Sequence, residues 1–153
     1  MTTRAPYQVL IIPFHIRNNK SPEFAITKRS DMNAWQFLSG GGEGVESPAE
    51  AAKREVMEEA GIPEDYKLIK LDSVASIPVN IAAARRHWGT DVYVIPEYCF
   101  AVDVGGRELV LSAEHIELKW LEYKDAVELL KWDSNRVALW ELRERISQIR
   151  NPG

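Results

Sequence analysis

Residues 47–62 carry strong local signals, and they specify a helix with both ends marked. Ser47 is suited to cap the N-terminus, Pro48 fits the first helical position, and Glu50 completes a Ser-x-x-Glu capping box. Gly61 predicts the C-terminus, because glycine readily adopts the left-handed conformation that ends many helices. One face of this helix carries small apolar side chains, at Ala49, Ala52, Val56 and Ala60. We therefore expect a helix that packs closely against a sheet.

The other segments alternate between strand-like and helix-like patterns. We expect strands at Gln8–Arg17, Glu23–Arg29, Trp35–Leu38, Leu68–Val79, Val92–Val104 and Glu117–Leu121. A glycine-rich loop is expected at Ser39–Gly44, and Pro13 suggests a bulge or an edge in the first strand. Helices are expected at Tyr123–Lys131 and Arg136–Ile149, the second with an apolar stripe formed by Leu139, Leu142, Ile146 and Ile149. This order predicts an α/β fold with a mixed sheet between helices.

Composition excludes several classes of protein. A chain of 153 residues suits a single domain over residues 1–153. Its net charge of −4 disfavours nucleic acid and anionic membranes as partners. The sequence shows no secretory leader and no stretch long enough to span a membrane. A lone cysteine, Cys99, fits a core position and a reducing compartment, so we expect a cytoplasmic protein.

Three glutamates of the predicted helix, Glu55, Glu58 and Glu59, lie within an arc of about 100° on one face. Like charges four residues apart destabilise a helix by about 0.2–0.5 kcal/mol per pair, so this face requires a compensating cation. Arg54 can offset Glu58 but cannot neutralise all three carboxylates. Oxygen ligands at this density suit Mg²⁺ or Mn²⁺. A solvated acidic face is the alternative interpretation.

The surrounding spacing favours the metal site. Gly40 is followed by five residues, Glu46, seven residues and then Arg-Glu-Val-Met-Glu-Glu-Ala-Gly-Ile, which begins at Arg54. This pattern resembles the Nudix box, Gly-x5-Glu-x7-Arg-Glu-U-x-Glu-Glu-x-Gly-U with U aliphatic, at every defined position. The resemblance implies an α/β/α sandwich and a hydrolase that cleaves a nucleoside diphosphate linked to another group.

The same resemblance implies roles for residues of the box. Glu55 and Glu59 are the main metal carboxylates, and Glu58 adds a further ligand or contacts the attacking water. Arg54 orients the glutamates, and the backbone carbonyl of Ser39 or Gly40 supplies an additional metal ligand. Clustered divalent metals suit this chemistry because they neutralise a polyphosphate and activate water.

Downstream segments narrow the resemblance. Trp35-Gln36, Ser112-Ala113-Glu114-His115, Lys119-Trp120-Leu121 and Trp132-Asp133-Ser134-Asn135-Arg136 look like the bacterial dihydroneopterin triphosphate pyrophosphohydrolases of folate synthesis. That similarity implies a catalytic, metal-binding role for Glu114. The chain departs from the pattern by an extra residue near Asp133 and in the loop at Asn80–Thr90.

Several residues are candidates for contacts with the substrate. Lys28 or Arg29 is expected to reach a phosphate, and Trp35 to stack on a ring; surface pairing and a core position are the alternatives. Ser39 and Gly41 belong to the glycine-rich segment that lets backbone approach the ligand. A basic cluster, Arg85-Arg86-His87, either grips phosphates or forms a solvated loop. We leave His115 outside the site, and we expect Trp120, Trp132 and Trp140 in the core.

The favoured function is a Mg²⁺-dependent pyrophosphohydrolase that converts dihydroneopterin triphosphate to the monophosphate and pyrophosphate. Alternatives are a Nudix enzyme for ADP-ribose or another nucleotide, and a catalytically silent domain that senses a nucleotide. Pro78 lies near a position where ADP-ribose-specific relatives carry proline, which keeps that alternative open. The expected partner is a small nucleotide or pterin triphosphate, bound by a monomer or homodimer.

Overall fold

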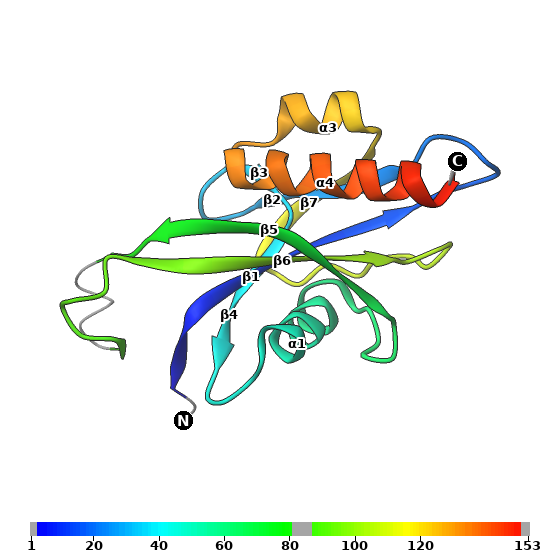
Figure 1. Ribbon diagram of the computed structural model, residues 1–153. Coiled ribbons are helices and arrows are strands. Elements are labelled where there is room, and N and C mark those ends of the chain that lie inside the picture. The colour runs from blue at the N-terminus through cyan, green and yellow to red at the C-terminus, as the bar shows by residue number, and fades with distance from the viewer. Residues whose placement is uncertain (1–2, 81–86, 151–153) are drawn as a thin grey trace.

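A computed structural model describes residues 3–80 and 87–150. Within them, seven strands form one mixed sheet: β1 (Arg4–His15), β2 (Glu23–Arg29), β3 (Trp35–Gln36), β4 (Leu38–Glu43), β5 (Leu68–Pro78), β6 (Val94–Asp103) and β7 (His115–Leu121). Helix α1 (Pro48–Ala60) covers one face, while α3 (Tyr123–Leu129) and α4 (Asp133–Arg150) cover the other (Figure 1). The predicted sandwich of helices around a mixed sheet is confirmed. None of the described helices is both long and apolar enough to cross a membrane.

Strand β1 lies at the centre of the sheet and changes partners along its length. It runs parallel to β6 on one side. On the other side it pairs with β4 as far as Ile11 and with β2 from Phe14 onward, both antiparallel. Pro13 lies between these two pairings, so the prediction of an edge or a bulge there is wrong. A residue without an N–H group is tolerated where one partner strand gives way to the next.

The glycine-rich segment is a strand, so the predicted loop at Ser39–Gly44 is wrong as far as Glu43. Pairing with β1 compensates for the weak intrinsic strand preference of glycine, with Gly40 opposite Val9 and Ser39 opposite Leu10. Close packing explains the composition, since a Cβ atom on Gly40 would lie 2.1 Å from the carboxyl carbon of Glu55. Only glycine allows that approach.

Helix α1 begins and ends as its sequence predicts. Ser47 and Glu50 form a complete capping box, and Gly61 ends the helix with φ 68°. The buried face packs on β1, β4 and β6 through Ala51, Ala52, Val56 and Ala60. Ala49 is exposed, although it was predicted on the buried face. The helix is rotated so that Ala51 is buried against the sheet instead.

On the opposite face, α4 contributes Leu139, Leu142 and Ile146 to the core, which also contains Cys99 as predicted. Ile149, near the end of α4, is 73% exposed, so this part of the predicted apolar stripe lies outside the core. Trp132 and Trp140 are 43% and 51% exposed, so the prediction that they are core residues is wrong. Trp120 is partly buried against the core under α1.

A bulge in β5 is held by a carboxylate from α4. The register between β5 and β6 shifts between Lys70 and Val74, which frees backbone N–H groups of the intervening residues. Asp72 and Ser73 donate these N–H groups to Glu141 at 2.6 and 2.8 Å. Burial opposes the charge of Glu141, but these bonds and one from Arg145 outweigh it and lower its pKa to about 2.

We expect Glu141→Gln to lower the free energy of unfolding by about 1–3 kcal/mol at pH 7, because charge-assisted bonds to the backbone N–H groups of the bulge are weakened. The pKa of Glu141 is depressed from 4.5 to about 2, so its contribution is present above pH 4.5 and is lost as pH falls toward 2. Urea unfolding at pH 7 and pH 3 measures both effects. Glu144→Gln, a change at a partly exposed neighbour, is the control. Equal stability of Glu141→Gln and the parent at pH 7 would contradict the assignment.

Candidate active site

The three glutamates of α1 occupy different environments. Glu55 and Glu59 are 8% exposed, whereas the side chain of Glu58 is 49% exposed. Burial raises the pKa of Glu55 to about 7, although the adjacent Arg54 counteracts the shift. Two buried carboxylates four residues apart are costly unless a cation accompanies them. Helix α1 therefore presents a pair of enclosed carboxylates and one accessible carboxylate.

Arg54 ties the helix to the segment before it. Its guanidinium donates to both carboxylate oxygens of Glu46, at 2.8 and 3.0 Å, and to the carbonyl oxygen of Gly41 at 2.9 Å. The same group contacts Glu55 at 3.0 Å and Glu58 at 3.2 Å. A planar group with five N–H donors can hold several oxygens in fixed positions at once. Arg54 thus fixes two of the three helix carboxylates relative to β4.

The segment before β7 folds back over the C-terminal end of α1. The backbone N–H groups of Val110 and Ser112 donate to the carbonyl oxygens of Ala60 and Glu59, both at 3.0 Å. Two side chains of this segment also contact Glu59: the Ser112 hydroxyl and His115 Nε2 lie 2.6 and 2.9 Å from its Oε2. These contacts join residues more than 50 positions apart.

This docking brings Glu114 to the helix carboxylates. Potential ligand atoms of Glu59, Glu114 and His115 all lie within 4.8 Å of one another. Glu114 itself is exposed, and its carbonyl oxygen accepts hydrogen bonds from the backbone and hydroxyl of Ser30. The downstream resemblance implies that Glu114 binds metal, and the structure places this residue beside Glu59 of the box.

A cavity of about 480 Å³ adjoins this group. Ser39 and Arg29 line it at the end nearest the carboxylates, since Gly40 packs under Glu55 and Arg29 pairs with His115 in the sheet. Its remaining wall comes from β1, β5, β6, the end of β3 with the residue after it, and the start of α4 with the residue before it. It includes Gln8, Gln36, Phe37, Ile77, Pro78, Glu97, Trp132, Ser134 and Asn135. The cavity therefore combines apolar and ring surfaces with a few polar groups, as small-molecule sites do.

Other predicted substrate contacts lie elsewhere. Lys28 and Trp35 pair across β2 and β3, with the ammonium nitrogen 5.9 Å from the ring centre, and neither lines the cavity. The reason is strand alternation, because Gln36 faces the cavity and its neighbour Trp35 therefore faces away. Gly41 contacts Arg54 through its carbonyl group and does not line the cavity. Arg85 and Arg86 lie outside the described residues.

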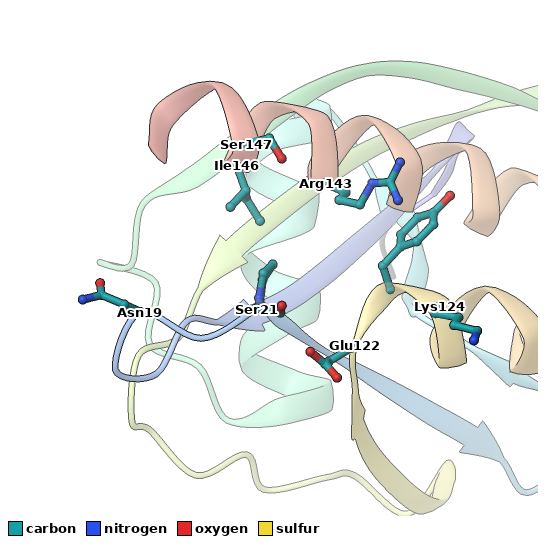
Figure 2. A pocket seen from close by; sticks show the side chains of 9 residues that line it. Asn19, Ser21, Glu122, Lys124, Arg143, Ile146 and Ser147 are labelled. Atoms are coloured by element: carbon teal, nitrogen blue, oxygen red, sulfur yellow. The ribbon is translucent and has the colours of Figure 1, made fainter. Parts of the chain in front are cut away.

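A larger hollow, of about 800 Å³, shares none of these residues. Figure 2 shows it between α4, the start of α3 and the turn after β1, with Arg143 on the α4 side. The guanidinium carbon of Arg143 lies 3.9 Å from the ring centre of Tyr123. No residue of the box lines it. We therefore assign the candidate active site to the smaller cavity and the adjoining carboxylates.

Comparison with known proteins agrees with this geometry. The NUDIX domain model matches residues 7–140. The chain belongs to the Nudix family. It is 44% identical to a solved NUDIX hydrolase from Listeria monocytogenes, with a TM-score of 0.82 over 95% of this chain and 97% of that one.

Two of the similar proteins come from Escherichia coli and are named for the same activity. The chain is 27% identical to the dihydroneopterin triphosphate diphosphatase of strain K12 over 138 residues, 89% of this chain and 91% of that one. The solved E. coli dihydroneopterin triphosphate pyrophosphohydrolase is 25% identical with a TM-score of 0.76, covering 95% of this chain and 99% of that one. This Nudix protein is therefore a pyrophosphohydrolase of small nucleotide-like substrates.

Nudix hydrolases use divalent metals, and the residues present fit such an ion. The buried Glu55 lies against Gly40, where a Cβ atom would collide with its carboxylate. Glu59 and Glu114 supply further oxygens, and His115 adds a nitrogen at the same point. Hard divalent cations bind oxygen-rich groups of this kind.

Several residues at the site were not predicted from the sequence. His115 was left out, yet it is buried against Glu59 together with Ser112, which lies in the same downstream segment. Glu46 belongs to the box spacing but received no role, and it is the main partner of Arg54. Glu97 carries no local signal, because only the sheet register brings it to the cavity.

Proposed function

We propose that this Nudix hydrolase converts dihydroneopterin triphosphate to dihydroneopterin monophosphate and pyrophosphate with Mg²⁺. The observation that supports this most is continuity between the carboxylate group and the cavity through Ser39 and Arg29. A triphosphate can reach the carboxylates while its ring enters the cavity. The similarity to E. coli enzymes that act on this substrate favours a pterin ring over other rings.

In this proposal Glu55, Glu59 and Glu114 hold Mg²⁺, with the carbonyl oxygen of Gly40 or Ser39 as a further ligand. Bound Mg²⁺ neutralises phosphate charge and makes water a better nucleophile. Arg54 keeps Glu55 and Glu58 in position through its contacts at 3.0 and 3.2 Å. Glu58 is the accessible carboxylate, so it is suited to position the attacking water and accept its proton. Arg29 contributes positive charge beside the phosphates.

A turnover panel tests the substrate. Dihydroneopterin triphosphate, ADP-ribose, diadenosine tetraphosphate and the common nucleoside triphosphates are compared at equal Mg²⁺ concentration, with products resolved by chromatography. We expect the highest kcat/KM for dihydroneopterin triphosphate, with pyrophosphate as a product. A higher kcat/KM for ADP-ribose would overturn the proposal and favour the alternative that Pro78 left open. Absence of turnover with every compound would favour a sensing domain.

We expect Glu114→Gln to lower kcat by about 10²-fold and to change KM much less, because a charge that holds metal and orients water acts mainly in the transition state. Stability is expected to change by less than about 0.5 kcal/mol, since Glu114 is exposed. Steady-state kinetics at saturating Mg²⁺ measure the effect. Glu117→Gln, an exposed carboxylate of β7, is the matched control. Parental kinetics in Glu114→Gln would remove Glu114 from the site.

A further inference from the structure

Glu97 is a buried carboxylate with unused hydrogen-bonding capacity in the wall of the cavity. It lies in the middle of β6, is 2% exposed, and lines the cavity. Its Oε2 accepts a hydrogen bond of 2.5 Å from Gln8, its neighbour in the register of β1 and β6. Its Oε1 has no hydrogen-bond partner within 3.5 Å among residues 3–80 and 87–150, although the Ser134 hydroxyl lies near enough to the carboxylate to affect its pKa. A buried carboxylate oxygen without a partner is costly and requires an explanation.

The surroundings of Glu97 supply little positive charge. Burial raises its pKa, and only the amide of Gln8 and the nearby hydroxyl of Ser134 counteract the shift. Arg29, the cationic residue of the cavity lining, is engaged with Asp31 through two bonds, at 2.8 and 2.6 Å. Glu97 also stands outside the group of Glu59, Glu114 and His115 that can share an ion. The missing partner of Oε1 is therefore expected to be a neutral N–H donor of a ligand.

The rest of the wall matches a flat ring. Ile77 and Pro78 offer apolar surface, and Trp132 is held at the rim by a 3.0 Å bond from its indole N–H to Gln36. A ring between such surfaces presents its edge, not its face, to a carboxylate in the wall. Two adjacent N–H groups on that edge match the two oxygens of a carboxylate.

We propose that Glu97 selects ligands that carry the 2-amino-4-oxopyrimidine edge, in which a ring N–H and an exocyclic amino group lie side by side. Pterins and guanine share this edge, whereas adenine, hypoxanthine and lumazine lack it. The inference rests on the proposed function in one respect: that function places the ring of the ligand in this cavity. Glu97 is thus a specificity residue that acts far from the phosphates.

Binding of small ligands to the parent protein tests the preference for the 2-amino-4-oxopyrimidine edge without any mutation. Neopterin is compared with its 2-oxo analogue of the lumazine series, and guanosine with inosine, by ligand fluorescence or calorimetry in metal-free buffer. We expect each 2-amino compound to bind about 10- to 100-fold more tightly than its partner, the range of one or two hydrogen bonds to a charged group. Equal affinity within both pairs, or no binding of any of the four, overturns the assignment.

Glu97→Gln then assigns the preference to the residue. The amide oxygen can still accept the bond from Gln8, while its NH₂ group faces the ligand and opposes an N–H donor. We expect the preference to fall to within about 3-fold, with a melting temperature close to that of the parent. Glu122→Gln, an exposed carboxylate beside the larger hollow, is the control and keeps the preference.

The outcomes separate this inference from the proposed function. Turnover of dihydroneopterin triphosphate without preference for the 2-amino compounds refutes the role of Glu97 alone. A preference that Glu97 controls, without turnover of that substrate, refutes the proposed substrate and supports the edge selection. A folded Glu97→Gln variant that retains the parental preference refutes the role of Glu97.

Discussion

Chelation of divalent metal with excess EDTA is expected to abolish hydrolysis by this protein, and added Mg²⁺ or Mn²⁺ is expected to restore it. The reason is the crowding of carboxylates, since Glu55 and Glu59 are buried on one helix face and Glu114 stands beside Glu59. Without a cation, this group repels the phosphate chain that it should hold. Product formation at a fixed substrate concentration, with and without chelator, measures the effect.

Binding of the metal can be checked independently of turnover. An ion that binds only the folded state raises the melting temperature as its concentration increases. We therefore expect Mg²⁺ to raise the melting temperature of the EDTA-treated protein, whereas an equal ionic strength of NaCl has little effect. Full activity in excess EDTA would refute the metal assignment, whatever the thermal shift.

Replacement of Glu59 with Gln is expected to lower kcat by about 10²- to 10⁴-fold, the scale of losing a key charge in the site. The fold is expected to hold, because Ser112 and His115 both contact one oxygen of Glu59 and the amide oxygen of Gln can replace it. The stabilisation by Mg²⁺ should weaken in parallel with kcat. Kinetics at several Mg²⁺ concentrations, together with melting curves, measure both effects.

Glu64→Gln is the matched control for this variant, since Glu64 is an exposed carboxylate just after α1. The control is expected to keep parental kinetics and the parental response to Mg²⁺. If Glu59→Gln retained activity within a few-fold of the parent, Glu59 would not be a metal ligand.

The features that can be predicted well from the sequence are those determined by residues close together in the chain. The capping box of Ser47 and Glu50, the end at Gly61 and the glutamate spacing all act within one or two helical turns. Pairing of β4 with β1 is different, because it joins Gly40 to Val9 across 31 positions and overrides the loop preference of glycine. Long-range pairing is the part that local patterns cannot supply.

The site shows the same division. Residues of the box follow from spacing alone, whereas His115 joins the site because the segment before β7 docks on α1 through the backbone of Val110 and Ser112. Trp132 contains as much apolar surface as a core residue, yet its indole N–H is bound to Gln36 at the rim of the cavity. Local hydrophobicity does not distinguish these two uses of tryptophan.

Strand β4 carries Ser39 on the cavity side and Gly40 under Glu55, so the two halves of the site meet at consecutive residues. Beyond this junction they use separate segments: the box glutamates lie in α1, whereas the cavity is lined by β1, β3, β5, β6 and the start of α4. If the cavity holds the ring as proposed, mutation and selection can alter which ring is accepted while the phosphate chemistry is inherited unchanged. For an engineer, Glu97 and Trp132 to Asn135 form a compact library in which new substrates can be sought without rebuilding the catalyst.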